Sequence, residues 1–310
     1  MTDTSTASPA PRIVFDRKLL RARRRRAVTY GAATFLLERA AEDLVERLQA
    51  VKRRFSFVLD LGTPGGALRD ALTMHSLGDT IVAAEPLAPY LRRGGLTVAA
   101  DEESLPFRDE SFDLIVSALS LQWVNDLPGT LIQIRRALKP DGLFLAVMAG
   151  GDTLTELRQS LAAAESEVEG GLSPRVAPFV EVRAMGTLLQ RAGFALPVTD
   201  VDRLIVRYAH LGALFRDLRA MGATNALADR RSKPLRRETI YRTGQIYASR
   251  FADPDGRLRA TFDLLSISAW APHESQQQPL KPGSAKMRLA EALGTDELPA
   301  GDKPPRRGGR

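Results

Sequence analysis

A series of short, almost continuously apolar runs that alternate with helical segments is the feature that most constrains the fold. Such runs are typical of strands covered by helices on both faces, because neither face of the strand meets water. A helix over 126–138 is expected to stop at Lys139-Pro140-Asp141-Gly142, where a proline and an Asp-Gly turn precede the next run. The sequence therefore predicts a parallel, doubly wound sheet with strands at 55–61, 80–85, 97–101, 112–120 and 143–150.

Beyond residue 150 the pattern changes. Helices are expected over 153–167 and 180–192, separated by a loop that Gly and Pro interrupt. Alternating apolar residues predict a strand over 198–208, and FDLLSISAW predicts another over 262–270. We expect these two strands to complete a seven-stranded, mostly parallel Rossmann-like α/β sheet. Helices near 210–220 and 235–250 are predicted to form a small helical cap around 209–250.

The 310-residue chain is long enough for one large domain with a cap. Residues 1–11 are rich in Ser, Thr and Pro and are expected to be disordered, as is the basic tail 299–310. We expect the domain to occupy 12–298 and to begin with N-terminal helices. One of these is an amphipathic helix from Phe35 to Val51, where apolar residues recur at helical spacing.

Charge and composition narrow the classes of partner. The net charge of +7 has one local peak at Arg21–Arg26, and we favour a solvated helix face there over attraction to an acidic partner or a membrane surface. No aromatic stripe accompanies the basic residues, so nucleic acid is not an expected partner. No apolar run reaches about 18 residues, so no integral membrane segment is expected. Zero cysteines and the lack of a secretory signal make the cytoplasm the default location.

A glycine loop follows the first predicted strand. DLGTPGG (60–66) stands between a strand and a helix, as a nucleotide-binding loop requires. Asp60, Gly62 and Gly66 match the usual acidic-x-Gly-x-Gly-x-Gly pattern, but Pro64 takes the place of the middle glycine. Proline has no N–H and a fixed φ, so we expect the approach of a ligand to be altered at that point.

Acidic residues end the next two predicted strands. Glu85 ends the second strand, where a carboxylate can accept hydrogen bonds from a ribose diol. Asp101 ends the third, where a carboxylate can accept from an adenine amino group. Glu102 is a further candidate at this edge, although it and Glu103 are expected to be largely solvated. Acids at successive strand ends favour one adenosine-shaped pocket.

The fourth predicted strand leads into the region where the reacting end of a ligand would lie. Ser117, Ser120, Gln122 and Trp123 occupy it. Ser117 is a further candidate for binding the cofactor, and Trp123 either walls the pocket or packs in the core. No catalytic base is identifiable from the sequence. The three histidines are dispersed, so no metal site is expected.

The stretch DEESLPFRDESFDLIVSALSLQWVNDLPGTLIQIRRALKPDG resembles class I S-adenosylmethionine (SAM)-dependent methyltransferases of the type 11 kind. GGDTL (150–154), HESQ (273–276) and the opening IVFDRKLLRARRRRA narrow the resemblance to the mitochondrial complex I assembly factor 5 family and its bacterial relatives. The resemblance covers about residues 12–286. It implies SAM as the cofactor, bound by the matching residues Asp60, Gly62, Gly66, Glu85 and Asp101.

The same resemblance implies a partner and a location. The partner is a protein, a subunit of respiratory complex I, with an arginine that is hydroxylated or methylated. The place is the cytoplasm of a respiring bacterium, at the inner face of its membrane. Two alternatives stay open. The segment 203–227 resembles the cap of malonyl-carrier-protein methyltransferases, and Pro64 favours a non-catalytic assembly chaperone that keeps only the fold.

Overall fold

The computed structural model describes residues 13–87, 95–277, 291 and 293–295. Residues 1–273 form one compact unit and residues 274–310 a second, and the fold described here is that of the first. The ends predicted to be disordered, 1–11 and 299–310, lie outside the described residues, so the domain limits stay predictions. None of the helices in the described part of the chain is both long and apolar enough to cross a membrane.

A seven-stranded sheet organises the first unit, in the order β3-β2-β1-β4-β5-β7-β6. All neighbouring pairs from β3 to β5 are parallel, whereas β7 runs antiparallel to both β5 and β6. The predicted fold class is confirmed. The strands are β1 (Phe57–Leu61), β2 (Thr80–Ala84), β3 (Leu96–Val98), β4 (Phe112–Ala118), β5 (Leu138–Ala149), β6 (Ala195–Tyr208) and β7 (Leu258–Trp270).

Successive residues of the central strands face opposite layers of helices. On β4, Ile115 packs in one core cluster while its neighbours Leu114 and Val116 pack in another. Helices α5 (Leu127–Ala137) and α7 (Val182–Arg191) cover the first cluster. Helices α2 (Phe35–Ala50) and α3 (Ala67–Met74) cover the second. The near-continuous apolar runs of the sequence follow from this double covering.

One local prediction is wrong. Lys139 to Gly142 was expected to separate a helix from a strand, but β5 already begins at Leu138. The Asp-Gly turn is absorbed as a bulge, with Asp141 at φ 59° and a register shift opposite β4 between Phe112 and Leu114. A bulge inserts an extra residue without ending a strand, and sequence patterns do not distinguish it from a turn.

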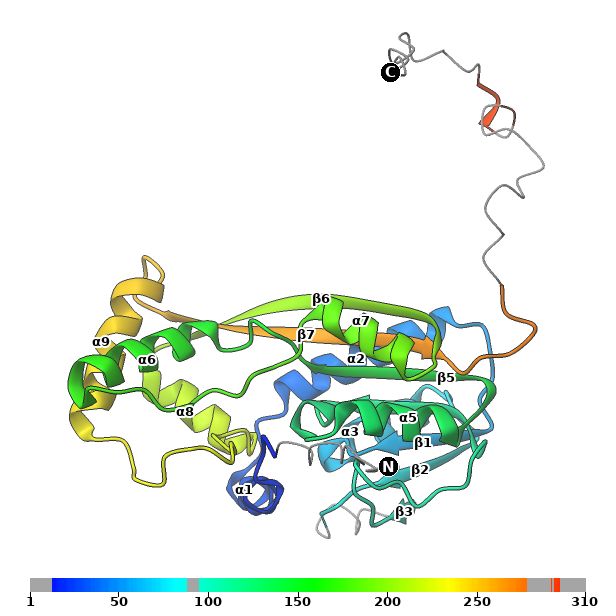
Figure 1. Cartoon of the computed structure of the whole chain (residues 1–310), viewed down its shortest axis with the longest axis horizontal. Coiled ribbons are helices and arrows are strands. Elements are labelled where there is room, and N and C mark those ends of the chain that lie inside the picture. Colours follow the sequence, from blue (N-terminus) through cyan, green and yellow to red (C-terminus); the bar gives the residue numbers. More distant parts are fainter. Residues whose placement is uncertain (1–12, 88–94, 278–290, 292, 296–310) are drawn as a thin grey trace, which may run out of the picture. The chain divides into compact units, whose positions relative to one another are not determined.

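The β6–β7 pair extends beyond the parallel part of the sheet and carries the cap. Helices α6 (Thr155–Glu169), α8 (Leu211–Ala220) and α9 (Arg237–Phe251), which we call the cap, pack on its far end around Tyr208, Tyr247 and Phe262. Figure 1 shows these helices gathered at one end of the pair, away from β1, β2 and β3. The cap still reaches the edge at which the parallel strands end, because Leu218 of α8 and Pro64 after β1 line the same cavity.

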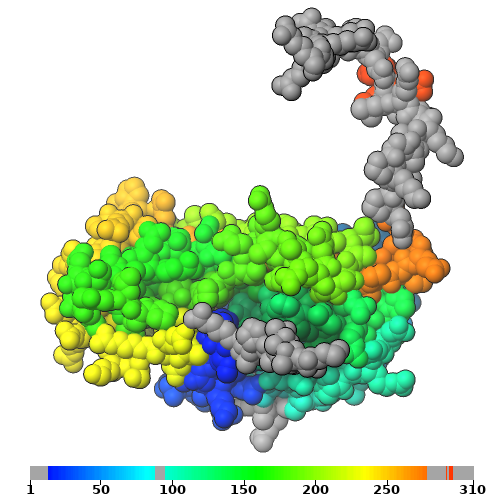
Figure 2. All heavy atoms as spheres, in the orientation of Figure 1, coloured from blue at the N-terminus to red at the C-terminus, as the bar shows by residue number. Residues whose placement is uncertain are grey.

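Helix α1 (Arg17–Tyr30) joins the cap to the parallel strands. Phe15 and Leu20 pack in a cluster with Trp123, which follows β4, and with Leu227, which follows α8. Arg23 donates to the carbonyl of Asn225 and Arg230 pairs with Asp16, 3.1 Å apart. Figure 2 shows the blue spheres of α1 against the yellow segment after α8.

The position of β7 inside the sheet can be tested by mutation. Ile267→Ala removes a fully buried side chain between β5 and β6 and is expected to lower the free energy of unfolding by about 3 kcal/mol. Ile205→Ala, on the outer strand β6 with its side chain 54% exposed, is the matched control and should cost less than about 1 kcal/mol. Denaturant unfolding measures both, and equal effects would contradict this strand order.

Candidate cofactor and substrate site

The carboxyl ends of β1, β2 and β4 meet at one edge of the sheet. Asp60 of β1 lies between Ala83 of β2 and Val116 of β4 in the strand register. Gly62, directly after β1, donates its N–H to the carbonyl of Ala84 at the end of β2, 2.7 Å away. The glycine loop and the predicted strand-end acids therefore belong to one edge of the sheet, as ligand sites in open α/β folds do.

Two carboxyl groups at this edge are buried with unused acceptor capacity. Glu85 Oε1 accepts from the N–H of Leu87 at 3.0 Å, but Oε2 has no hydrogen-bond partner among the described residues. Asp60 likewise keeps Oδ1 without a partner there. Burial raises the pKa of Glu85 to about 8, opposed by the nearby Arg24, and raises that of Asp60 to about 7. Buried oxygens without partners cost free energy, so a donor brought by a ligand would stabilise them.

Three consecutive acids after β3, Asp101 to Glu103, form ion pairs with arginines of α1. Arg17 Nη2 lies 2.9 Å from Asp101 and pairs with Glu102, and Arg21 pairs with the other oxygen of Asp101. Glu102 is only 2% exposed, so its predicted solvation is wrong. Glu103 also departs from that expectation, since it contacts Arg17 at 3.3 Å.

Gly62 permits the close approach of Glu102 to the glycine loop. Its φ is +69°, and a Cβ at this position would lie 2.5 Å from Ser120 Oγ and 2.7 Å from Glu102 Oε1. Ser120 in turn donates to Glu102 at 2.6 Å. Ser120 and Arg17 therefore hold the side chain of Glu102 against Gly62, where it forms one wall of the proposed ligand site.

Pro64 fits the observed loop without strain. It opens the short 3-10 helix η1 (Pro64–Gly66), where an N–H would have no partner within the helix. Gly65 and Gly66 follow with φ of 79° and 81°, in the left-handed region that glycine adopts at little cost. The loop therefore keeps its turn although the middle glycine is absent.

Ser117 occupies a different environment from the other candidates. It is fully buried and its hydroxyl donates to the carbonyl of Leu61 at 2.7 Å, which ties β4 to β1. This contact favours a structural role for its hydroxyl.

Helix α1 contributes residues that sequence reasoning missed. Arg24 is 5% exposed, although the run Arg21–Arg26 was expected to be a solvated face, so that expectation is wrong for the inner side of the helix. Arg17, Arg21 and Arg24 lie at i, i+4 and i+7, which places them on one face. Arg25 and Arg26 remain exposed. The spacing of Arg17, Arg21 and Arg24 was the one feature of the sequence that could have shown that these arginines share a face of the helix.

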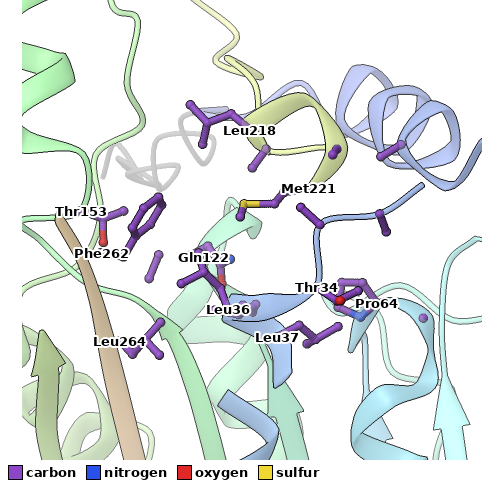
Figure 3. Close-up of a pocket in the computed structure, with 18 of the residues that line it drawn as sticks. Thr34, Leu36, Leu37, Pro64, Gln122, Thr153, Leu218, Met221, Phe262 and Leu264 are labelled. Atoms are coloured by element: carbon purple, nitrogen blue, oxygen red, sulfur yellow. The ribbon is translucent and has the colours of Figure 1, made fainter. Parts of the chain in front are cut away.

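A cavity of about 360 Å³ opens beside the glycine loop, between the sheet and the cap (Figure 3). Its lining is mainly apolar, and Gln122 projects among Leu36, Leu37 and Leu264 in the close-up. Gln122 Oε1 is buried and has no partner within the described residues. The cavity can therefore hold a side chain with an apolar stem whose polar end donates a hydrogen bond to Gln122.

Trp123 lines this cavity and also packs edge-on against Phe15 and Phe179, with ring centroids 5.4 and 6.3 Å away. It serves as both a cavity wall and a core residue, the two roles that the sequence left open. A second cavity of about 390 Å³ adjoins at Trp123 and reaches into the cap. The two cavities share Trp123, Leu154, Phe179, Leu218 and Ala223.

The buried acceptor oxygens at the edge fit an adenosine-containing cofactor. Ribose hydroxyls and an adenine amino group are hydrogen-bond donors, and Glu85 offers a buried acceptor without a partner. Within the described ranges, no three His, Cys, Asp or Glu side chains are grouped so as to hold a metal ion.

Comparison with known proteins agrees with this geometry. Residues 59–146 match the methyltransferase domain family of type 11. The chain is 38% identical to the human protein named arginine-hydroxylase NDUFAF5, mitochondrial, over 92% of this chain and 85% of that protein. It is 32% identical to the malonyl-[acyl-carrier protein] O-methyltransferase of Laribacter hongkongensis, over 84% of this chain and 90% of that protein.

A solved structure shows the same fold. The YcgJ protein of Bacillus subtilis superposes with a TM-score of 0.53 at 14% identity, covering 75% of this chain and 99% of that one. The fold, the matched domain and the near full-length similarity lead to one conclusion. The chain belongs to the methyltransferase-fold family that includes NDUFAF5 and the malonyl-[acyl-carrier protein] O-methyltransferases.

Proposed function

We propose that the chain binds SAM at the carboxyl edge of its sheet and modifies a protein subunit of respiratory complex I during assembly. The observation that carries SAM binding is the pair of buried strand-end carboxyls, Asp60 and Glu85, each with an oxygen that lacks a partner among the described residues. Near full-length similarity to NDUFAF5 proteins supports the role in assembly.

The proposed contacts follow the strand ends. Glu85 Oε2 accepts from the ribose diol, and Asp60 with the loop Gly62–Gly66 lies beneath the amino-acid tail of the cofactor. Asp101 faces the adenine amino group and keeps its ion pairs with Arg17 and Arg21 on the other side. Glu102 acts as the wall described above rather than as a direct ligand.

SAM, when bound, supplies an electrophilic methyl group or a cationic sulfonium beside the substrate. The chain's own contribution is to position the substrate in the 360 Å³ cavity, which begins at Pro64 and Gly65. Gln122 offers the buried acceptor that orients the incoming group.

The proposed substrate is an arginine of a complex I subunit, in the bacterial cytoplasm at the inner face of the membrane. The chain methylates it with the methyl group of SAM, or hydroxylates it with a separate oxidant of the dioxygen class, since SAM supplies no oxygen atom. The exposed Arg25 and Arg26 of α1 suit contact with an anionic surface there. A second candidate is methyl transfer to a malonyl carrier protein. It is favoured by the 32% identity over 277 residues to an enzyme of that name.

Deletion of the gene in its own host separates these functions. Loss of assembled complex I, with a subunit arginine that lacks one oxygen or one methyl group by mass spectrometry, supports the assembly role. Biotin auxotrophy with intact complex I supports the carrier methyltransferase instead, because the malonyl-carrier-protein methyltransferases that residues 203–227 resemble act in biotin synthesis. Restoration of complex I by a variant that cannot bind SAM would indicate a chaperone without turnover and contradict the proposal.

SAM binding is tested directly by calorimetry with Glu85→Gln. The amide keeps the shape of the side chain but replaces one carboxyl oxygen with an N–H donor, so it cannot accept from both ribose hydroxyls, and affinity for SAM should fall by about 10-fold or more. Glu46→Gln, an exposed acid on α2, is the matched control and should bind as the unaltered protein does. Absence of binding to the unaltered protein would overturn the proposed cofactor.

Removing the buried acid should also make the ligand-free protein more stable at alkaline pH. The pKa of Glu85 is raised to about 8 in the folded state by burial, so the folded state holds its proton more tightly than the unfolded state. The stability contributed by this proton is present in acid and is lost as pH rises through about 8.

Glu85→Gln is therefore expected to raise the free energy of unfolding by about 1–3 kcal/mol at pH 9 and to change it little at about pH 5. Thermal or denaturant unfolding at the two pH values measures the difference. A variant less stable than the parent at both pH values would show that ionisation of Glu85 does not destabilise the folded protein.

A further inference from the structure

We propose that Arg24 of α1 binds the α-carboxylate of the methionine portion of SAM. The inference deepens the proposed function and rests on it. Arg24 was not among the residues that the sequence pointed to, and it is nearly fully buried at 5% exposure. A buried guanidinium needs partners for its charge and for its N–H donors.

The contacts of Arg24 leave donors unused. Among the described residues, it makes one hydrogen bond, a long one of 3.4 Å from Nη2 to the carbonyl of Leu119, directly after β4. Its charge acts on Glu85, the carboxyl proposed to hold the ribose. A guanidinium has five N–H donors, so the remaining ones can take a bidentate carboxylate.

The position of Arg24 matches the place where the amino-acid tail must lie. The ribose end of the cofactor is assigned to Glu85, and the reacting end to the cavity that Leu119 and Gln122 line. The guanidinium of Arg24 lies at Leu119, which lines that cavity, and its positive charge opposes the rise in the pKa of Glu85. Ala27 and Val28, one helical turn further along α1, line the same cavity.

The backbone around Arg24 is fixed, so its side chain is held toward the edge. Gly222, with φ +68°, packs so closely that a Cβ there would lie 2.8 Å from the Cα of Arg24. Arg21 and Arg17, one and two turns before, are anchored on Asp101 and Glu102. A side chain fixed in this way loses little conformational freedom on binding a ligand.

The test compares SAM with decarboxylated SAM, which keeps the adenosine, the sulfonium and the ammonium but lacks the carboxylate. Arg24→Gln should weaken SAM binding by about 10- to 100-fold in calorimetric titration. Binding of decarboxylated SAM should stay within about threefold of the parent, since no carboxylate is present to lose its partner. If the substitution also disturbs Glu85, it weakens both ligands alike, because both carry the same ribose, and the ratio of the two affinities does not change.

Two variants control this experiment. Arg25→Gln removes an exposed charge from the next position of α1 and should leave the ratio of the two affinities unchanged. Arg24→Lys keeps a positive charge without the planar fork and should restore part of the preference for SAM. Thermal unfolding of each variant shows whether the fold is retained.

The outcomes separate the two proposals. If the unaltered protein binds neither ligand, the proposed cofactor fails and this inference fails with it. If it binds SAM, and Arg24→Gln weakens both ligands equally or neither, SAM binding stands and the role of Arg24 is overturned. A selective loss against SAM, with partial recovery in Arg24→Lys, supports the carboxylate contact.

Discussion

Burial of several carboxyl groups at one edge of the sheet is the constraint on which the rest of the structure depends. Asp60 and Glu85 end neighbouring parallel strands and are removed from water, so their pKa values rise. Glu102 is buried as deeply but gains an arginine. An uncompensated buried charge is far costlier than a paired one. The face of α1 that carries Arg17, Arg21 and Arg24 places positive charge beside these buried acids, which explains why the helix packs at this edge.

This arrangement couples the edge to the cap. Helix α1 is held on one side by the carboxylates of the β3–β4 connection and on the other by the segment after α8, through Arg23 and Asn225 and through Arg230 and Asp16. The cavity beside the glycine loop lies between these elements, so residues of α1, the sheet and α8 all line it. The cap and the proposed cofactor site therefore share packed side chains around one cavity.

The sheet was predictable because its strands are buried on both faces and read as unbroken apolar runs. Glu85 and Asp101 were singled out because topology places the ends of parallel strands together. Glu85 directly follows β2, but β3 ends at Val98, so the prediction that Asp101 ends the third strand is wrong and Asp101 lies three residues beyond it. The burial of Glu102 was not predictable, since an acid is buried only where a distant partner such as Arg17 reaches it. Arg24 was missed for a related reason: hydrophobic periodicity counts apolar residues, and here a charged residue takes an inward position.

Pro64 raised the question whether the glycine loop can still bind a cofactor. The loop keeps its turn with proline at the start of η1, so the missing N–H is no obstacle to the fold of the glycine loop. The stronger constraint on a cofactor is electrostatic. A ligand entering this edge meets the acids Asp60 and Glu85 and the cation Arg24 together. Such a mixed field favours a ligand that carries both charges on one tail, because each charge then lies opposite its complement. An amino-acid tail meets that requirement, since its carboxylate can pair with Arg24 and its ammonium can donate to the oxygen of Asp60 that has no partner among the described residues.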